Sequence, residues 1–170
     1  MRSKFSIAGH PLHPALVALP IGLFIWSLVA IVVYEARDHE HMWYSIALWS
    51  AGAAVVTALL AALPGFGDYF TMAYHSEARG MATVHMLANL TTVALFAISI
   101  ALMADDGATE GGRLATVIVL QALGVGILGL SGWLGGEMVF RHRLGVLGEA
   151  EVSEATQRRR GSFAARPHSR

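Results

Sequence analysis

The chain has 170 residues, of which 55% are hydrophobic and only 14% are charged, and its mean hydropathy is +0.53. This composition excludes an ordinary soluble domain and predicts an integral membrane protein. Cysteine is absent, which excludes disulfides, thiol chemistry and iron–sulfur ligation by this chain. The formal net charge is zero, and we expect no nucleic-acid partner.

Four apolar runs are each long enough to cross the hydrocarbon core of a bilayer, which takes about 20 helical residues. They occupy residues 14–34, 43–63, 81–103 and 114–136. Their central stretches contain no Asp, Glu, Lys or Arg, whereas each helix of a soluble four-helix bundle keeps a polar face. The predicted fold is therefore all-α, an integral membrane four-helix bundle over residues 1–146. A polar, arginine-rich tail follows over residues 147–170, and we expect it to be disordered.

A short motif leads into the first run, because residues 9–14 read Gly-His-Pro-Leu-His-Pro. Pro14 suits the first position of a helix, which predicts His13 at the helix cap and His10 one turn upstream. Pro20 lacks a backbone N–H and should bend the helix near its start. The motif therefore sets two imidazoles where the chain enters the membrane.

Small residues recur along the second and fourth runs. In the second run they are spaced four apart, which predicts a seam for close helix packing; they are Ser50, Ala54, Ala58 and Ala62. In the fourth run, glycines predict either tight helix packing or clearance for a flat cofactor; they are Gly124, Gly126, Gly129, Gly132, Gly135 and Gly136.

The longest connection, residues 64–80, lies between the second and third runs. Residues 65–68 read Gly-Phe-Gly-Asp, which predicts a turn, with Asp68 capping a short interfacial segment over 69–75. Ser76 is the predicted cap of the third helix. This connection therefore predicts a helix end, an interfacial segment and a helix start.

The distribution of Lys and Arg predicts the orientation in the membrane. The connections at 35–42 and 104–113 are mainly acidic. The opposite side, which holds both termini and residues 64–80, carries most of the basic residues near the span ends: Arg2, Lys4, Arg79, Arg141, Arg143 and the tail arginines. We therefore expect a multi-pass protein of the bacterial inner membrane with both termini in the cytoplasm.

This topology brings seven titratable groups to one membrane face: His10, His13, Asp68, His75, His85, Glu137 and His142. His85 lies inside an apolar run, and Asn89 and Thr92 share its helical face. This polar stripe should face the bundle interior, because lipid offers no hydrogen-bonding partners. Glu137 has the spacing of an ordinary helical ion pair with Arg141.

Histidines on separate helices near one membrane face are what axial ligation of a b-type haem requires. We take His13 and His85 as the axial pair, with Asn89 orienting the His85 ring through a hydrogen bond. The histidines that could support or replace a member of this pair are His10, His75 and His142. The expected function is single-electron transfer, with a quinone or a redox protein as partner.

Two alternatives remain open at this point. One is a non-haem transition-metal site, whose candidate ligands are His10, His13, His85 and Asp68. The other is a cofactor-free scaffold subunit of a membrane complex, and a second copy of the chain is a further candidate partner. The sequence shows no nucleophile motif and no His-Glu-x-x-His. We therefore expect an electron carrier or accessory subunit rather than a stand-alone enzyme.

Several motifs occur together in the order typical of one bacterial family: residues 9–14 running into 16–22, residues 65–68, His85 with Asn89, and residues 132–139 before His142. Over about residues 9–146 the chain resembles the membrane proteins called domain of unknown function 2231. The resemblance implies a four-helix membrane domain. It also implies a link to electron transfer, because in other proteins this domain is sometimes joined to a Rieske iron–sulfur domain, for which this chain has no cysteine.

Overall fold

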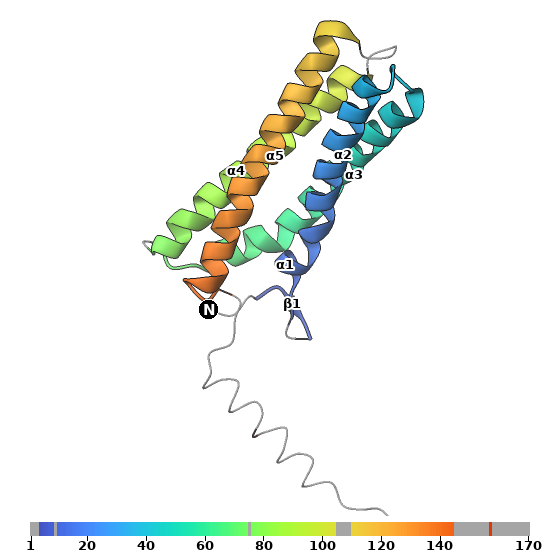
Figure 1. Cartoon of the computed structure of the whole chain (residues 1–170). Helices are drawn as coiled ribbons and strands as arrows, with labels where there is room; N and C mark the ends of the chain where they lie inside the picture. The colour runs from blue at the N-terminus through green and yellow to red at the C-terminus, as the bar shows by residue number, and fades with distance from the viewer. Residues whose placement is uncertain (1–3, 9, 75, 105–109, 145–156, 158–170) are drawn as a thin grey trace, which may run out of the picture.

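The computed structural model describes residues 4–8, 10–74, 76–104, 110–144 and 157. Its elements in chain order are β1 (Ser6–Ile7), β2 (His10–Pro11), α1 (Leu12–Leu16), α2 (Ala18–Ala36), α3 (His41–Phe70), α4 (Glu77–Ala104) and α5 (Gly111–Phe140). Within the described residues, four helical segments are long and apolar enough to cross a membrane, and α1 with α2 forms the first of them (Figure 1). The predicted four-helix membrane fold is thus confirmed. Of the predicted tail, 147–170, only position 157 is described.

The chain enters the first helix differently from the sequence expectation. The short strands β1 and β2 form an antiparallel hairpin in which Ser6 pairs with Pro11. Pro11 holds an extended backbone, with φ −61° and ψ 130°, and it is the N-cap of α1. The helix therefore begins at Leu12, so the prediction that Pro14 opens it with His13 at the cap is wrong. His13 instead lies within the first turn.

Two prolines bend the helices that carry them. Val17 separates α1 from α2, three residues before Pro20, so the helix is interrupted where the sequence predicts a bend. The second, Pro64, lies inside α3, which continues to Phe70. The turn predicted at 65–68 is therefore wrong, because the helix accommodates Pro64 within its length instead of ending there.

The ends of α3 and α4 test two predicted caps. Asp68 lies within α3 and accepts a hydrogen bond from the Lys4 backbone N–H, 3.0 Å away, so it does not begin a new segment over 69–75. Ser76 does act as a cap, because its Oγ accepts the Arg79 N–H at 3.2 Å.

The four helices are arranged as two closely packed pairs, α2 with α3 and α4 with α5. The Phe24 and Phe96 rings join the two pairs, with their centroids 4.4 Å apart. Phe96 rests on Gly124, where an added Cβ would lie 2.8 Å from the Phe96 ring. At this position the glycine serves close packing, one of the two roles predicted for the glycines of the fourth run.

A fully buried polar network connects all four helices. Gln121 on α5 donates to Ser99 Oγ on α4 at 3.1 Å and accepts from Ser27 Oγ on α2 at 3.1 Å. Ser27 Oγ also lies 2.9 Å from the carbonyl of Ala47 on α3. Because lipid supplies no hydrogen-bonding groups, these contacts fix how the four helices are rotated against one another.

Replacing Gln121 by Leu should lower the free energy of unfolding in detergent by about 1–2 kcal/mol, because it removes two interhelical hydrogen bonds that average roughly 0.6 kcal/mol each in membrane proteins. The matched control is Thr116→Ala on the same helix, where an exposed hydroxyl bonds only to the carbonyl of Gly112. Equal unfolding free energies for the two variants, measured by denaturant titration, would contradict this role of Gln121.

Candidate cofactor site

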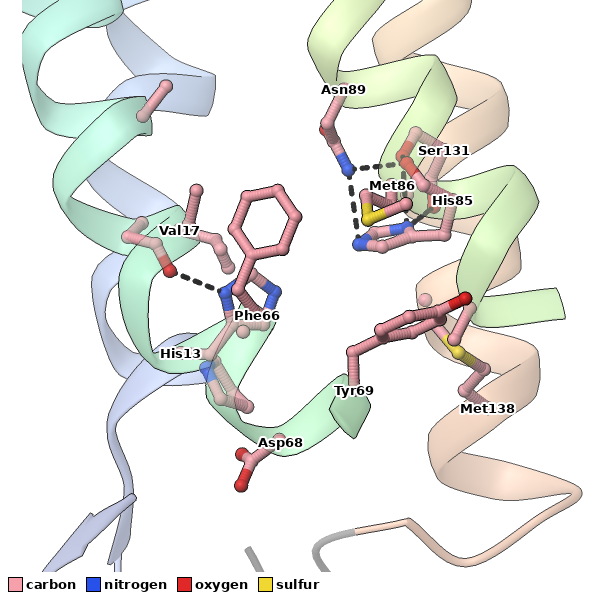
Figure 2. Close-up of a pocket in the computed structure, with 18 of the residues that line it drawn as sticks. His13, Val17, Phe66, Asp68, Tyr69, His85, Met86, Asn89, Ser131 and Met138 are labelled. Carbon is pink, nitrogen blue, oxygen red and sulfur yellow. Dashed lines mark hydrogen bonds between the residues drawn. The ribbon is translucent and has the colours of Figure 1, made fainter. Parts of the chain in front are cut away.

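A cavity of about 470 Å³ lies between the two helix pairs, near the end of the bundle that carries the N-terminal hairpin. Its walls are mainly apolar and come from α1, α2, α3, α4 and α5. The volume falls in the range of about 300–1,000 Å³ typical of small-molecule and cofactor sites. Figure 2 shows the histidines and the aromatic side chains that line it.

Glycines on α5 leave room in this cavity. Gly132 and Gly136 both line it, and a Cβ added at either would meet no atom within 4 Å. Gly135, between them, faces the His85 ring, with an added Cβ 3.4 Å from Cε1. These glycines therefore leave open space at the cavity, whereas Gly124 serves packing.

His13 is held against the bend in α3. Its Nδ1 lies 2.8 Å from the carbonyl oxygen of Ala61, three residues before Pro64. Because a carbonyl only accepts, Nδ1 carries a proton, and in the neutral ring the lone pair is on Nε2. Gly65 makes this position available, since an added Cβ would lie 2.8 Å from Nδ1.

His85 is held in the same tautomer by α5. Its Nδ1 lies 2.9 Å from both the carbonyl oxygen and the Oγ of Ser131. The hydroxyl of Ser131 also lies 3.3 Å from the His85 carbonyl, to which it donates, so its oxygen accepts from Nδ1. Ser131 is thus the group that orients this ring.

Asn89 contacts the other nitrogen of His85. Its Nδ2 lies 3.1 Å from His85 Nε2 and 2.9 Å from the His85 carbonyl oxygen. The predicted contact between Asn89 and His85 exists, but it involves the nitrogen with the free lone pair. Thr92, the third member of the predicted stripe, is buried and donates to the carbonyl of Gly124 at 3.1 Å, so the stripe faces the bundle interior as expected.

The two imidazoles face each other across the cavity, as Figure 2 shows. The ring centroids of His13 and His85 are 6.2 Å apart, and the ring planes are nearly perpendicular, at 89°. A metal ion bound by two imidazole nitrogens at about 2 Å each, with each ring centre roughly 1 Å behind its nitrogen, holds the ring centres about 6 Å apart. The observed separation matches this value.

Of the other predicted ligands, only Asp68 is among the described residues that line the cavity. His10 is exposed, bonds to the Ala8 carbonyl at 3.2 Å and does not line the cavity. His142 follows α5 and is also absent from the lining, and His75 lies outside the described residues. Asp68 lines the cavity at the end of α3.

A metal site with several protein ligands does not form in the described part of the chain. No group of three or more His, Cys, Asp or Glu side chains there is placed to hold a metal ion. The set His10, His13, His85 and Asp68, predicted as ligands, is therefore not assembled.

Glu137 forms the predicted ion pair with Arg141 at 3.6 Å.

Comparison with known proteins identifies one match. A family model described as "Predicted membrane protein (DUF2231)" matches residues 9–148, which include α1 to α5 and both cavity histidines. No curated protein and no solved structure matches the chain.

The tautomers of the two histidines are testable by ¹⁵N–¹H correlation spectra of the imidazoles in detergent micelles. Both rings should give the pattern of the Nδ1–H form. Gly65→Ala should remove this pattern from His13, because the new methyl group overlaps Nδ1, and leave His85 unchanged. Gly52→Ala on the same helix, where an added Cβ meets no atom within 4 Å, is the control. An unchanged His13 signal in Gly65→Ala would contradict the packing described.

Proposed function

The chain belongs to the DUF2231 family of predicted membrane proteins, and we propose that this member binds haem b between His13 and His85 and carries single electrons. The observation that carries the proposal is the pair of facing imidazoles, whose centroids are 6.2 Å apart. Each ring donates its Nδ1–H to a backbone carbonyl, which leaves the two Nε2 lone pairs for a metal.

The number of protein ligands favours haem over a bare metal ion. A zinc site takes three or four protein ligands, and related ions have similar needs. The porphyrin already supplies four nitrogens to its iron, so the protein needs to provide only two axial ligands. In the described residues, no third His, Cys, Asp or Glu is placed with the two histidines to hold a metal ion, which fits this requirement.

The cavity also suits a flat apolar group. Its volume is about 470 Å³, and Gly132 and Gly136 leave its α5 wall without side chains. When bound, haem supplies a centre that accepts and gives up one electron. The chain's own residues hold the group: His13 and His85 as ligands, and Ser131 and the Ala61 carbonyl as the groups that orient them. A quinone or a redox protein is the proposed electron partner.

One contact favours a second candidate function, that of a cofactor-free scaffold subunit. Asn89 already donates to the Nε2 of His85, so this nitrogen has a partner without any ligand. Haem binding requires Asn89 to give up this bond, while its 2.9 Å bond to the His85 carbonyl can remain. The two functions therefore make opposite predictions for cofactor content.

The decisive measurement is a dithionite-reduced minus oxidised visible spectrum of the purified protein, expressed with haem supplied, with metal analysis of the same sample. We expect the sharp α-band of a b-type haem. His13→Ala and His85→Ala should each abolish it, because each removes one axial ligand. His10→Ala and His142→Ala are the matched controls and should retain the band, because neither side chain lines the cavity.

A flat spectrum from correctly folded protein would retire the haem proposal. Metal content would then decide between a metal site and a scaffold subunit. If the band were lost in His10→Ala or His142→Ala but retained in His13→Ala, the ligand would be His10 or His142 and not His13.

We also propose that the end of the bundle with the cavity faces the cytoplasm of a bacterium. Basic residues support this orientation, since Lys4, Arg79, Arg141 and Arg143 belong to that end and the opposite connections are mainly acidic. A reporter that is active only in the cytoplasm should give signal when fused after position 170 and none when inserted at position 38. The reverse pattern would invert the orientation and leave the geometry of the site unchanged.

A further inference from the structure

Two leucines line the cavity and are also exposed on the outside of the bundle. Leu59 on α3 is 48% exposed and Leu90 on α4 is 40% exposed, yet both contribute to the cavity wall. Side chains that are exposed and also belong to the cavity wall mark where the cavity comes nearest to the surface. The cavity therefore opens sideways between α3 and α4, which do not belong to the same closely packed pair.

This opening lies at the depth of the hydrocarbon. Leu59 is 11 residues before the end of α3 and Leu90 is 13 residues after the start of α4, which is about 16 Å and 20 Å along their helices from the same end of the bundle. A bilayer core is about 30 Å thick. Both side chains therefore lie near the middle of the membrane, where the medium outside the opening is lipid.

At the end of the bundle, the N-terminal hairpin is fastened to α3. The Lys4 N–H donates to Asp68 at 3.0 Å, and Leu12 N–H donates to the Phe5 carbonyl at 2.9 Å. The Phe5 ring lies on Gly67, where an added Cβ would overlap it. On this side, a ligand coming from water would pass beside this fastened segment.

We infer that the cavity is filled from the bilayer, by a flat apolar ligand that passes sideways between α3 and α4 at Leu59 and Leu90. That the ligand is haem rests on the proposed function, whereas the route rests on the exposed cavity wall alone. The chemistry of the route agrees with such a ligand, because its two flanking side chains are aliphatic and carry no charge.

The first test uses no haem. The chain has no cysteine, so Gly136→Cys places a single thiol in the cavity, at a position where an added Cβ meets no atom within 4 Å. In phosphatidylcholine liposomes, pyrene maleimide dissolved in the bilayer should label this thiol faster than a sulfonated, water-soluble maleimide. Adding Leu59→Trp and Leu90→Trp should slow the pyrene reagent by about tenfold, equivalent to roughly 1.4 kcal/mol in the barrier.

The matched control replaces two neighbouring leucines that face lipid without lining the cavity. Leu60 is 56% exposed and Leu87 is 55% exposed, so Leu60→Trp with Leu87→Trp adds the same bulk to the same helices outside the opening. Labelling in this control should match that of Gly136→Cys alone. Faster labelling by the water-soluble reagent, or equal slowing in both tryptophan pairs, would overturn the route.

The cavity also reaches the surface beside Gly132 on α5, which is exposed and lines it. Gly132→Trp therefore serves as the competing variant. Slowing in Gly132→Trp without slowing in the Leu59 and Leu90 pair would move the route to this side and overturn the inference.

The second test follows the Soret band as haemin passes from donor liposomes into the protein. Leu59→Trp with Leu90→Trp should load about tenfold more slowly and reach the same final spectrum. If no variant takes up haem, the proposed function fails while the labelling result still decides the route. If haem loads at the same rate in every variant, the route fails and the proposed function stands.

Discussion

The hydrogen bonds of Gln121 are the constraint on which the arrangement of the four helices depends. In lipid, a buried polar side chain has no partner except within the protein. Gln121, Ser99 and Ser27, with the Ala47 carbonyl beside Ser27, come within hydrogen-bonding distance only when the four helices have one rotation. This network holds the two helix pairs together away from the cavity. At the other end of the bundle, the two pairs can therefore lie further apart around the cavity while the helices keep the same rotation.

Local signals made much of this fold predictable. The apolar runs correspond to the four helical spans, and the interruption at Val17 follows from Pro20. The cap at Ser76 and the ion pair of Glu137 with Arg141 each join residues within about one helical turn. The meeting of His13 with His85 was also predictable, because an even number of membrane crossings returns the chain to the same face. The sequence alone could not supply their separation, which depends on the bend of α3 and on how closely the helix pairs approach.

Several features that escaped prediction depend on partners distant in sequence. Ser131 orients His85 across 46 positions of the chain, and Gln121 acts through residues on two other helices. The glycine and proline signals near position 65 predicted a turn. The helix continues there because Gly65 lies beneath His13 and Gly67 beneath Phe5, contacts that no local pattern contains.

The break at Val17 gives the two histidines unequal mechanical support. His85 belongs to a 28-residue helix, whereas His13 lies on the five-residue helix α1, continuous with the hairpin that Lys4 fastens to Asp68. Force applied at the amino terminus is therefore transmitted to one wall of the cavity and scarcely to the other. An affinity tag or fusion partner at that end pulls on His13 directly, so the carboxyl terminus is the safer attachment point for work on this protein.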